Sequence, residues 1–78
     1  MMTPRVWADF NNRDEQNRVR LNTHGSLEGL SKLPQIEPGT VITVCDDEVE
    51  VDVSLERDGP IWVGVMISDY RDATAEND

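Results

Sequence analysis

The stretch that decides the fold runs from Thr40 to Ser68 and reads TVITVCDDEVEVDVSLERDGPIWVGVMIS. From Val49 to Glu56, apolar and polar residues alternate without a break. A period of two with β-branched residues predicts a strand that buries one face. The run from Ile61 to Ile67 is apolar throughout, which is typical of a strand covered on both sides. A further strand over Thr40–Cys45 makes this half of the chain antiparallel β-structure.

Two hairpin registers compete at the turn between the two longest strands. A two-residue turn at 58–59 would place Leu55 opposite Trp62, whereas a three-residue loop at 57–59 would place Leu55 opposite Ile61. The longer loop stacks the β-branched residues of both strands on one face. It also puts its glycine at the left-handed position that such loops require. We therefore predict the three-residue loop.

The first third of the chain adds two more predicted strands, Arg5–Phe10 and Arg18–Thr23. The stretch NNRDEQN at 11–17 is rich in residues that turn the chain by bonding their own backbone, and is predicted to be an exposed hairpin loop. Residues 26–33 are predicted to form a short helical segment, with Ser26 as its cap.

The predicted fold class is therefore all-β in the main. We expect a five-stranded small antiparallel barrel with one short helical segment. Residues 1–68 form the single domain. Residues 69–78 lack an apolar pattern and are predicted to be a flexible acidic tail.

Two resemblances accompany this interpretation. In strand count and spacing the chain resembles the SH3-like small barrels. Its opening is similar to that of short bacterial proteins of uncharacterised function that share the pattern V-x-A-D-F-N-N, R-V-R-L and G-S-L. Here the pattern is matched by Val6, Ala8–Asn12, Val19–Leu21 and Gly25–Leu27. The second resemblance covers about the first third of the chain and implies no activity.

The strongly negative net charge restricts the classes of partner that the protein can bind. The net charge is −9, and it divides into +1 for residues 1–33 and −10 for residues 34–78. Strong acidity repels phosphate backbones and anionic membranes, so we expect neither a membrane nor, in general, a nucleic acid as partner. The acidity is equally explained as a means of keeping a small domain soluble.

The sequence also predicts that the protein binds no cofactor and is not an enzyme. With one cysteine (Cys45) and one histidine (His24), a disulfide is excluded and a zinc site is not expected. The acidic run from Asp46 to Asp52 matches no calcium loop. No nucleophile with a base and an orienting group can be assigned, so we predict that the protein is not an enzyme. The N-terminus does not read as a signal peptide, and we expect a cytoplasmic protein.

Two surfaces are candidate binding sites. In the predicted register, Trp62, Gly64 and Met66 lie on the outward face of the last hairpin as a shallow apolar patch. The alternative is that the helical segment or the first hairpin covers Trp62 inside the fold. The outward face of the first two strands would carry Arg5, Trp7, Arg18 and Arg20.

These arginines could grip a phosphate or stack on a base. The alternative is that they neutralise the acidic stripe of the later strands.

The leading hypothesis is a small accessory or binding protein that acts through a protein–protein surface, either with a partner or by self-association. A nucleic-acid module that uses the N-terminal arginines is an alternative. Another is an acidic decoy that binds a basic protein through the stripe from Asp46 to Asp58.

Overall fold

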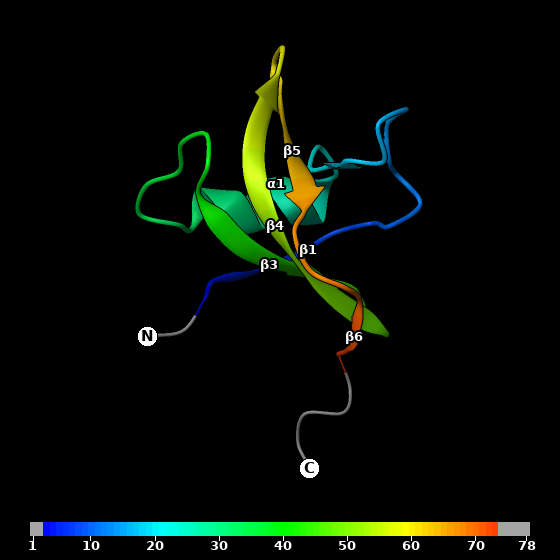
Figure 1. Cartoon of the computed structure of the whole chain (residues 1–78). Coiled ribbons are helices and arrows are strands. Elements are labelled where there is room, and N and C mark those ends of the chain that lie inside the picture. The colour runs from blue at the N-terminus through cyan, green and yellow to red at the C-terminus, as the bar shows by residue number, and fades with distance from the viewer. Residues whose placement is uncertain (1–2, 74–78) are drawn as a thin grey trace.

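The computed structural model describes residues 3–73 and shows one curled sheet with a helix packed beside it (Figure 1). The strands are β1 (Arg5–Trp7), β2 (Val19–Arg20), β3 (Val41–Cys45), β4 (Val49–Asp58), β5 (Ile61–Met66) and β6 (Arg71–Asp72), and the helix is α1 (His24–Ser31). The described part of the chain is therefore mainly β with one short helix, as predicted.

The strand order within the described residues is β1-β3-β4-β5-β2, and β6 pairs with β4 beyond the end of β5. β1 and β2 lie at the two ends of this order and do not pair with each other. The sheet therefore curls without closing, and the predicted five-stranded antiparallel barrel is corrected to an open half-barrel. The likeness to SH3-like barrels stays a prediction.

The predicted hairpin between the first two strands is wrong. β1 instead pairs in parallel with β3, where Val6 lies opposite Val44, and β2 pairs antiparallel with β5, where Val19 lies opposite Gly64. Strands of three and two residues make few hydrogen bonds of their own. β1 pairs with the free edge of β3, and β2 pairs with the free edge of β5. The N-terminal segment therefore runs from one edge of the sheet to the other.

The turn between β4 and β5 consists of Gly59 and Pro60, and Asp58 lies opposite Ile61. Both registers considered from the sequence are therefore wrong, although Gly59 has the expected positive φ, 63°. A two-residue hairpin turn can take glycine with positive φ at its first corner. Proline suits the second corner because its ring fixes φ near the required value. The Gly59–Pro60 turn therefore lies one residue further along the chain than the two-residue turn considered at 58–59.

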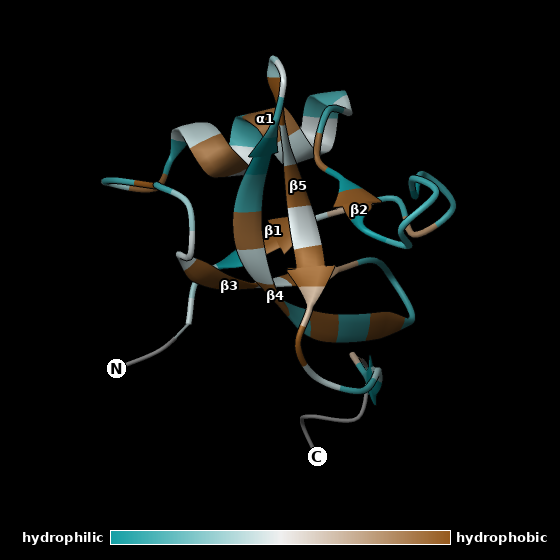
Figure 2. Ribbon diagram, turned by 45° about the horizontal axis from the view of Figure 1, so that its top comes forward, coloured by the Kyte–Doolittle hydropathy of each residue, from teal (hydrophilic) through white to brown (hydrophobic). Residues whose placement is uncertain are grey.

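The inner face of the curled sheet carries the core. Figure 2 shows apolar and polar residues alternating along β4, as the sequence pattern predicts. The outward-facing residues of β4 include Glu50 and Asp52, which are half-buried. The inner face and α1 together bury Val6, Ala8, Val19, Leu21, Leu30, Ile42, Val44, Val51, Val53 and Leu55.

Helix α1 begins earlier than predicted. Thr23, not Ser26, is the N-cap, and its Oγ1 accepts a hydrogen bond from the Ser26 backbone N–H over 3.3 Å. The freed Ser26 hydroxyl is buried and donates to the Trp7 carbonyl over 2.7 Å, which covers part of the β1 edge. Gly29 faces Val6 so closely that a Cβ there would lie 2.9 Å from Val6 Cγ1. Among the described residues no helix has the length and apolar character needed to cross a membrane.

Candidate protein-interaction surface

Beyond β5 the chain bulges away from β4 and returns to it as β6. The Ile67 backbone N–H donates to the Asp52 carbonyl over 2.9 Å, and the next paired residues are Arg71 and Glu50. One strand thus advances from 67 to 71 while its partner moves only from 52 to 50. Extra residues in one strand bend it and re-aim its side chains. Ser68 stabilises this bulge, because its Oγ accepts from the Asp52 N–H over 3.0 Å.

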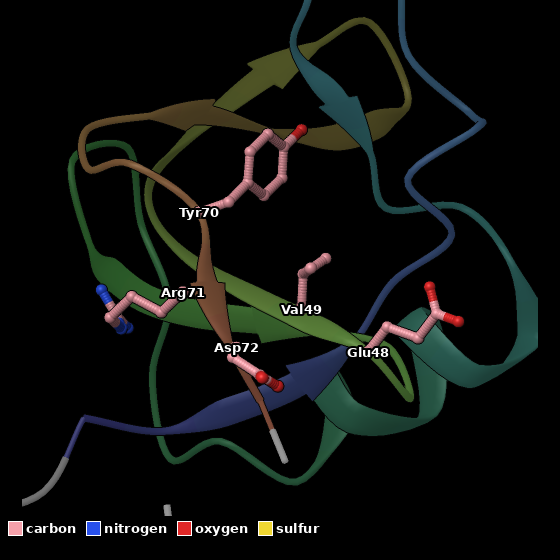
Figure 3. Close-up of a pocket in the computed structure, with 5 residues that line it drawn as sticks. All are labelled: Glu48, Val49, Tyr70, Arg71 and Asp72. Carbon is pink, nitrogen blue, oxygen red and sulfur yellow. The ribbon is translucent and has the colours of Figure 1, made fainter. Parts of the chain in front are cut away.

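The bulge places Tyr70 at the open side of the half-barrel. Its ring meets Phe10 in an edge contact, with centroids 5.6 Å apart and planes at 78°. Figure 3 shows Tyr70 and Val49 directed into the same opening, whereas Arg71 points away from it. A shallow depression of about 480 Å³ lies here, called the mouth depression, and it is lined by Glu48, Val49, Tyr70, Arg71 and Asp72.

Arg71 fixes β6 to the outer face of the sheet. Its Nε lies 3.0 Å from Glu50 Oε2, and its Nη2 lies 2.9 Å from Asp52 Oδ1. Arg5 Nη1 reaches Glu50 Oε1 over 2.7 Å, and the Thr43 hydroxyl donates to Asp52 Oδ1 over 2.8 Å. These two carboxylates are therefore shared among groups from β1, β3 and β6.

This network shifts the acidity of both carboxyls. The hydrogen bond from Arg5, supported by Arg71, holds the pKa of Glu50 below its ordinary value. The hydrogen bond from Arg71, supported by Thr43, does the same for the pKa of Asp52. Both carboxyls are consequently charged in the folded protein, and the positive charge of Arg71 is neutralised on the outer face.

One exposed carboxylate lines the mouth depression outside every described ion pair, and two more acidic residues are its neighbours in the sequence. Glu48 is exposed, and so are Asp47 and Asp69, which adjoin the lining residues in the sequence. No ion pair within the described residues involves any of these three carboxylates. An apolar and aromatic surface with uncompensated negative charge at its edge is suited to a cationic group that carries an aliphatic stem.

The predicted patch of Trp62, Gly64 and Met66 does lie on one face of β5, but that face is the inner one. Met66 lies opposite Val53, and Trp62 and Met66 pack against the core. A Cβ at Gly64 would lie 2.8 Å from Val53 Cγ2, so the glycine permits close packing. The Arg57 guanidinium covers the half-buried Trp62 ring at 5.1 Å from its centroid. The prediction that this patch faces outward is wrong because the register differs.

The predicted arginine cluster is divided between two edges of the sheet. Arg5 and Trp7 belong to β1, whereas Arg20 belongs to β2 and Arg18 precedes it. Trp7 is 45% exposed on the outer face, where it packs beside Gly25 of α1. The arrangement does not bring an indole and several guanidinium groups together.

Arg18 and Arg20 each bind internal acceptors. Arg18 Nε lies 2.7 Å from Asp14 Oδ2, and its Nη2 lies 3.4 Å from Asp58 Oδ2. Arg20 Nη1 donates to the Arg13 carbonyl over 3.1 Å. Arg5 therefore pairs with an acid of the later strands, as the alternative has it, whereas the shorter ion pair of Arg18 is with Asp14 of its own loop.

The loop at 11–17 is ordered by one carboxylate. Asp14 Oδ1 accepts from the backbone N–H groups of Gln16 and Arg18, each over 2.9 Å. These bonds, with the ion pair to Arg18, hold the pKa of Asp14 below its ordinary value, and the hydrogen bond from the Arg18 backbone is the main cause. The loop at 11–17 is largely exposed, as predicted, although Asn12 and Asp14 are half-buried.

The acidic turn between β3 and β4 has a structural explanation. Asp46 Oδ1 accepts from the backbone N–H groups of Glu48 and Val49, over 2.7 and 2.8 Å. Within residues 3–73 no group of three or more histidine, cysteine or acidic side chains is placed to hold a metal ion. Cys45 is a free, half-buried thiol, and His24 is the exposed first residue of α1.

Comparison with known proteins identifies no relative. No family model matches the chain, and neither a curated protein nor a solved structure matches it. Function must therefore be argued from the geometry of this chain.

Sequence reasoning missed the residues of the mouth depression. Tyr70 and Arg71 fall in the stretch predicted to be a flexible tail, yet Tyr70 contacts Phe10 and Arg71 belongs to β6. The sequence offers one signal, an aromatic residue beside an arginine in an otherwise small and polar segment. The part of that predicted tail from 74 to 78 lies outside the described residues.

Proposed function

We propose that this chain is a small, non-enzymatic binding protein that acts through a protein–protein surface and recognises a basic segment of its partner. The observation that carries the proposal is that exposed carboxylates lie outside the described ion pairs, whereas the basic side chains have partners. All seven basic side chains of the chain have an internal acceptor or counter-ion. The side chains that donate to neutral oxygens keep their positive charge, but 16 carboxylates against seven basic groups leave a net charge of −9 to attract a partner.

The basic residues are satisfied in different ways. Arg5, Arg18, Lys32 and Arg71 pair with carboxylates. The guanidinium groups of the other three donate to a carbonyl or amide oxygen: Arg13 to Asn17, Arg20 to Arg13 and Arg57 to Gly59. A surface of this kind steers positively charged partners towards it and repels nucleic acids.

The linings of the two described depressions differ in polarity. The mouth depression contains carboxylates, a valine, an arginine and a tyrosine. A second depression, of about 290 Å³, is formed by Asp14, Glu15, Gln16, Arg18, Arg20 and Asp58. The second depression is polar and internally ion-paired, so the mouth depression is the better candidate for contact with a protein.

The proposal is tested by fluorescence anisotropy with two labelled peptides of equal length, one lysine–glycine and one glutamate–glycine. We expect the lysine peptide to bind and its affinity to fall as salt is raised, because exposed charges are screened. The glutamate peptide should not bind. Equal binding of both peptides, or of neither, would overturn the proposal. Sedimentation of the protein alone gives the extent of self-association under the same conditions.

A further inference from the structure

We propose that the mouth depression is a pocket for one lysine or arginine side chain of a partner protein, with Tyr70 and Val49 against its stem and Glu48 at its charge. The inference rests on the function proposed above and names the site and the group recognised. It is carried by three features of the mouth, which are its aromatic floor, its rim and the direction of Arg71.

The floor is preformed. The edge contact with Phe10 holds the Tyr70 ring, and yet 46% of Tyr70 is exposed. The half-buried Val49 side chain points into the same opening (Figure 3). Neighbouring apolar and aromatic surface at one opening can cover the methylene stem of a long basic side chain. A positive charge over the tyrosine ring gains cation–π attraction as well.

The rim supplies the charge complementarity. Glu48 lines the depression, is exposed and takes part in no described ion pair. Arg71 also lines it, but Glu50 and Asp52 bind its guanidinium on the outer face. The local field at the opening is therefore negative, and an anionic ligand or a nucleic acid would be repelled.

A second copy of this chain is a poor occupant. It carries the same net charge of −9, so two copies repel each other. A foreign segment with a solvated lysine or arginine meets no such repulsion. The geometry therefore favours a different protein as partner.

The test is an NMR titration of the ¹⁵N-labelled protein with the lysine–glycine peptide, with affinities measured by anisotropy. We expect the amide shifts to concentrate at 48–49 and 70–72. Tyr70→Leu, which keeps an apolar contact with Phe10 but removes the ring from the floor, should weaken binding about fivefold or more. Glu48→Gln, which removes only the charge, should also weaken it.

Matched controls separate this site from general acidity. Trp7→Leu removes an exposed aromatic from another surface, and Glu37→Gln removes an exposed carboxylate from a distant loop. Both should bind the peptide as the unaltered protein does. Thermal melts of all four variants show whether each remains folded, and Glu48→Gln tests the site even if Tyr70→Leu unfolds.

The two proposals fail in different ways. If the unaltered protein binds the lysine peptide but the shifts lie elsewhere, or if Glu48→Gln and Glu37→Gln bind equally well, the mouth assignment is overturned and the proposed function stands. If the unaltered protein does not bind the lysine peptide, both are overturned.

Discussion

Individual residues in this small domain have roles that their residue type alone does not reveal. Ser26 looks like a helix cap, but its hydroxyl is buried and bonds to the edge of β1. Asp14 looks like a solvated loop residue, but it organises that loop. Gly29 lowers helix propensity, but it allows α1 to approach Val6. In each case the contact partner comes from another part of the fold or of the loop.

Asp14→Ala should lower the melting temperature by several degrees, because two backbone N–H groups and the Arg18 guanidinium lose their acceptor. Glu15→Ala is the matched control, since Glu15 is exposed in the same loop. Circular dichroism melts of the two variants measure the difference. Equal melting temperatures would mean that the Asp14 bonds do not stabilise the fold.

Gly64→Ala should destabilise the protein by roughly 1–3 kcal/mol, because the new Cβ would lie 2.8 Å from Val53 Cγ2 and 2.9 Å from Val53 Cβ. Urea unfolding gives the change in the free energy of unfolding. Ser54→Ala, which alters a half-buried residue of the neighbouring strand, is the control for a small change in the sheet. An unchanged free energy for Gly64→Ala would contradict the close approach of β5 and β4.

At the scale of elements, β4 organises the sheet. Its two halves pair with different partners on the same side, β5 along one half and β6 along the other, and the bulge at 68–70 separates them. β3 pairs along its other side. The bulge turns Tyr70 to the inner face and leaves Arg71 on the outer face, so one element both closes part of the opening and neutralises the outer carboxylates.

The attachment of β6 predicts a pH dependence of stability. The pKa values of Glu50 and Asp52 lie below their ordinary values of 4.5 and 3.8 in the folded protein. Their stabilising contribution is therefore present above those ordinary values and is lost as the pH falls through the lower folded-state values. Both side chains are partly exposed to solvent, which screens the effect.

Arg71→Gln is the variant that tests this dependence. It should lower stability at neutral pH and reduce the loss of stability on acidification, because both carboxylates lose one partner. Urea unfolding at neutral pH and at a series of values below 4.5 provides the comparison. Lys32→Gln, which removes a charge from the 4.0 Å pair with Glu28, is the control. Parallel pH profiles for Arg71→Gln and the unaltered protein would rule out this role for the network.

At the scale of the whole molecule, the acidic and basic side chains are unevenly distributed over the surface. The net charge of −9 comes from 16 acidic and seven basic side chains, and four of the basic ones pair with carboxylates inside the fold. β6 lies beside the start of β4, next to the acidic turn between β3 and β4 (Figure 1). This placement is what distinguishes the mouth depression from the ion-paired depression beside Arg18 and Arg20.

The protein should cause no mobility shift of random DNA or RNA at low salt. Its acidity repels phosphate, and the arginines that could grip one are bound to internal acceptors. A strongly basic protein of similar size serves as the positive control. A salt-sensitive shift that is lost in Arg20→Glu would favour the nucleic-acid alternative instead.

The sequence alone determined the three central strands, because a period of two and β-branched residues act locally and over many residues. β3, β4 and β5 lie close to where the stretch from Thr40 to Ser68 places them. The burial of Val51, Val53 and Leu55 agrees with that alternation along β4. The helix was located but its cap was misassigned, since Thr23 and Ser26 are both capable caps.

Only the tertiary structure decided how these elements meet. β1 and β2 are too short to specify a partner, so free edges of longer strands select their pairing. The Gly59–Pro60 turn sets a register that side-chain alternation cannot distinguish from its neighbours. The bulge that aims Tyr70 inward depends on contacts with Phe10, Glu50 and Asp52, which are distant in sequence. The candidate site could therefore not be predicted from the sequence, because long-range strand pairing, and no local pattern, brings its residues together.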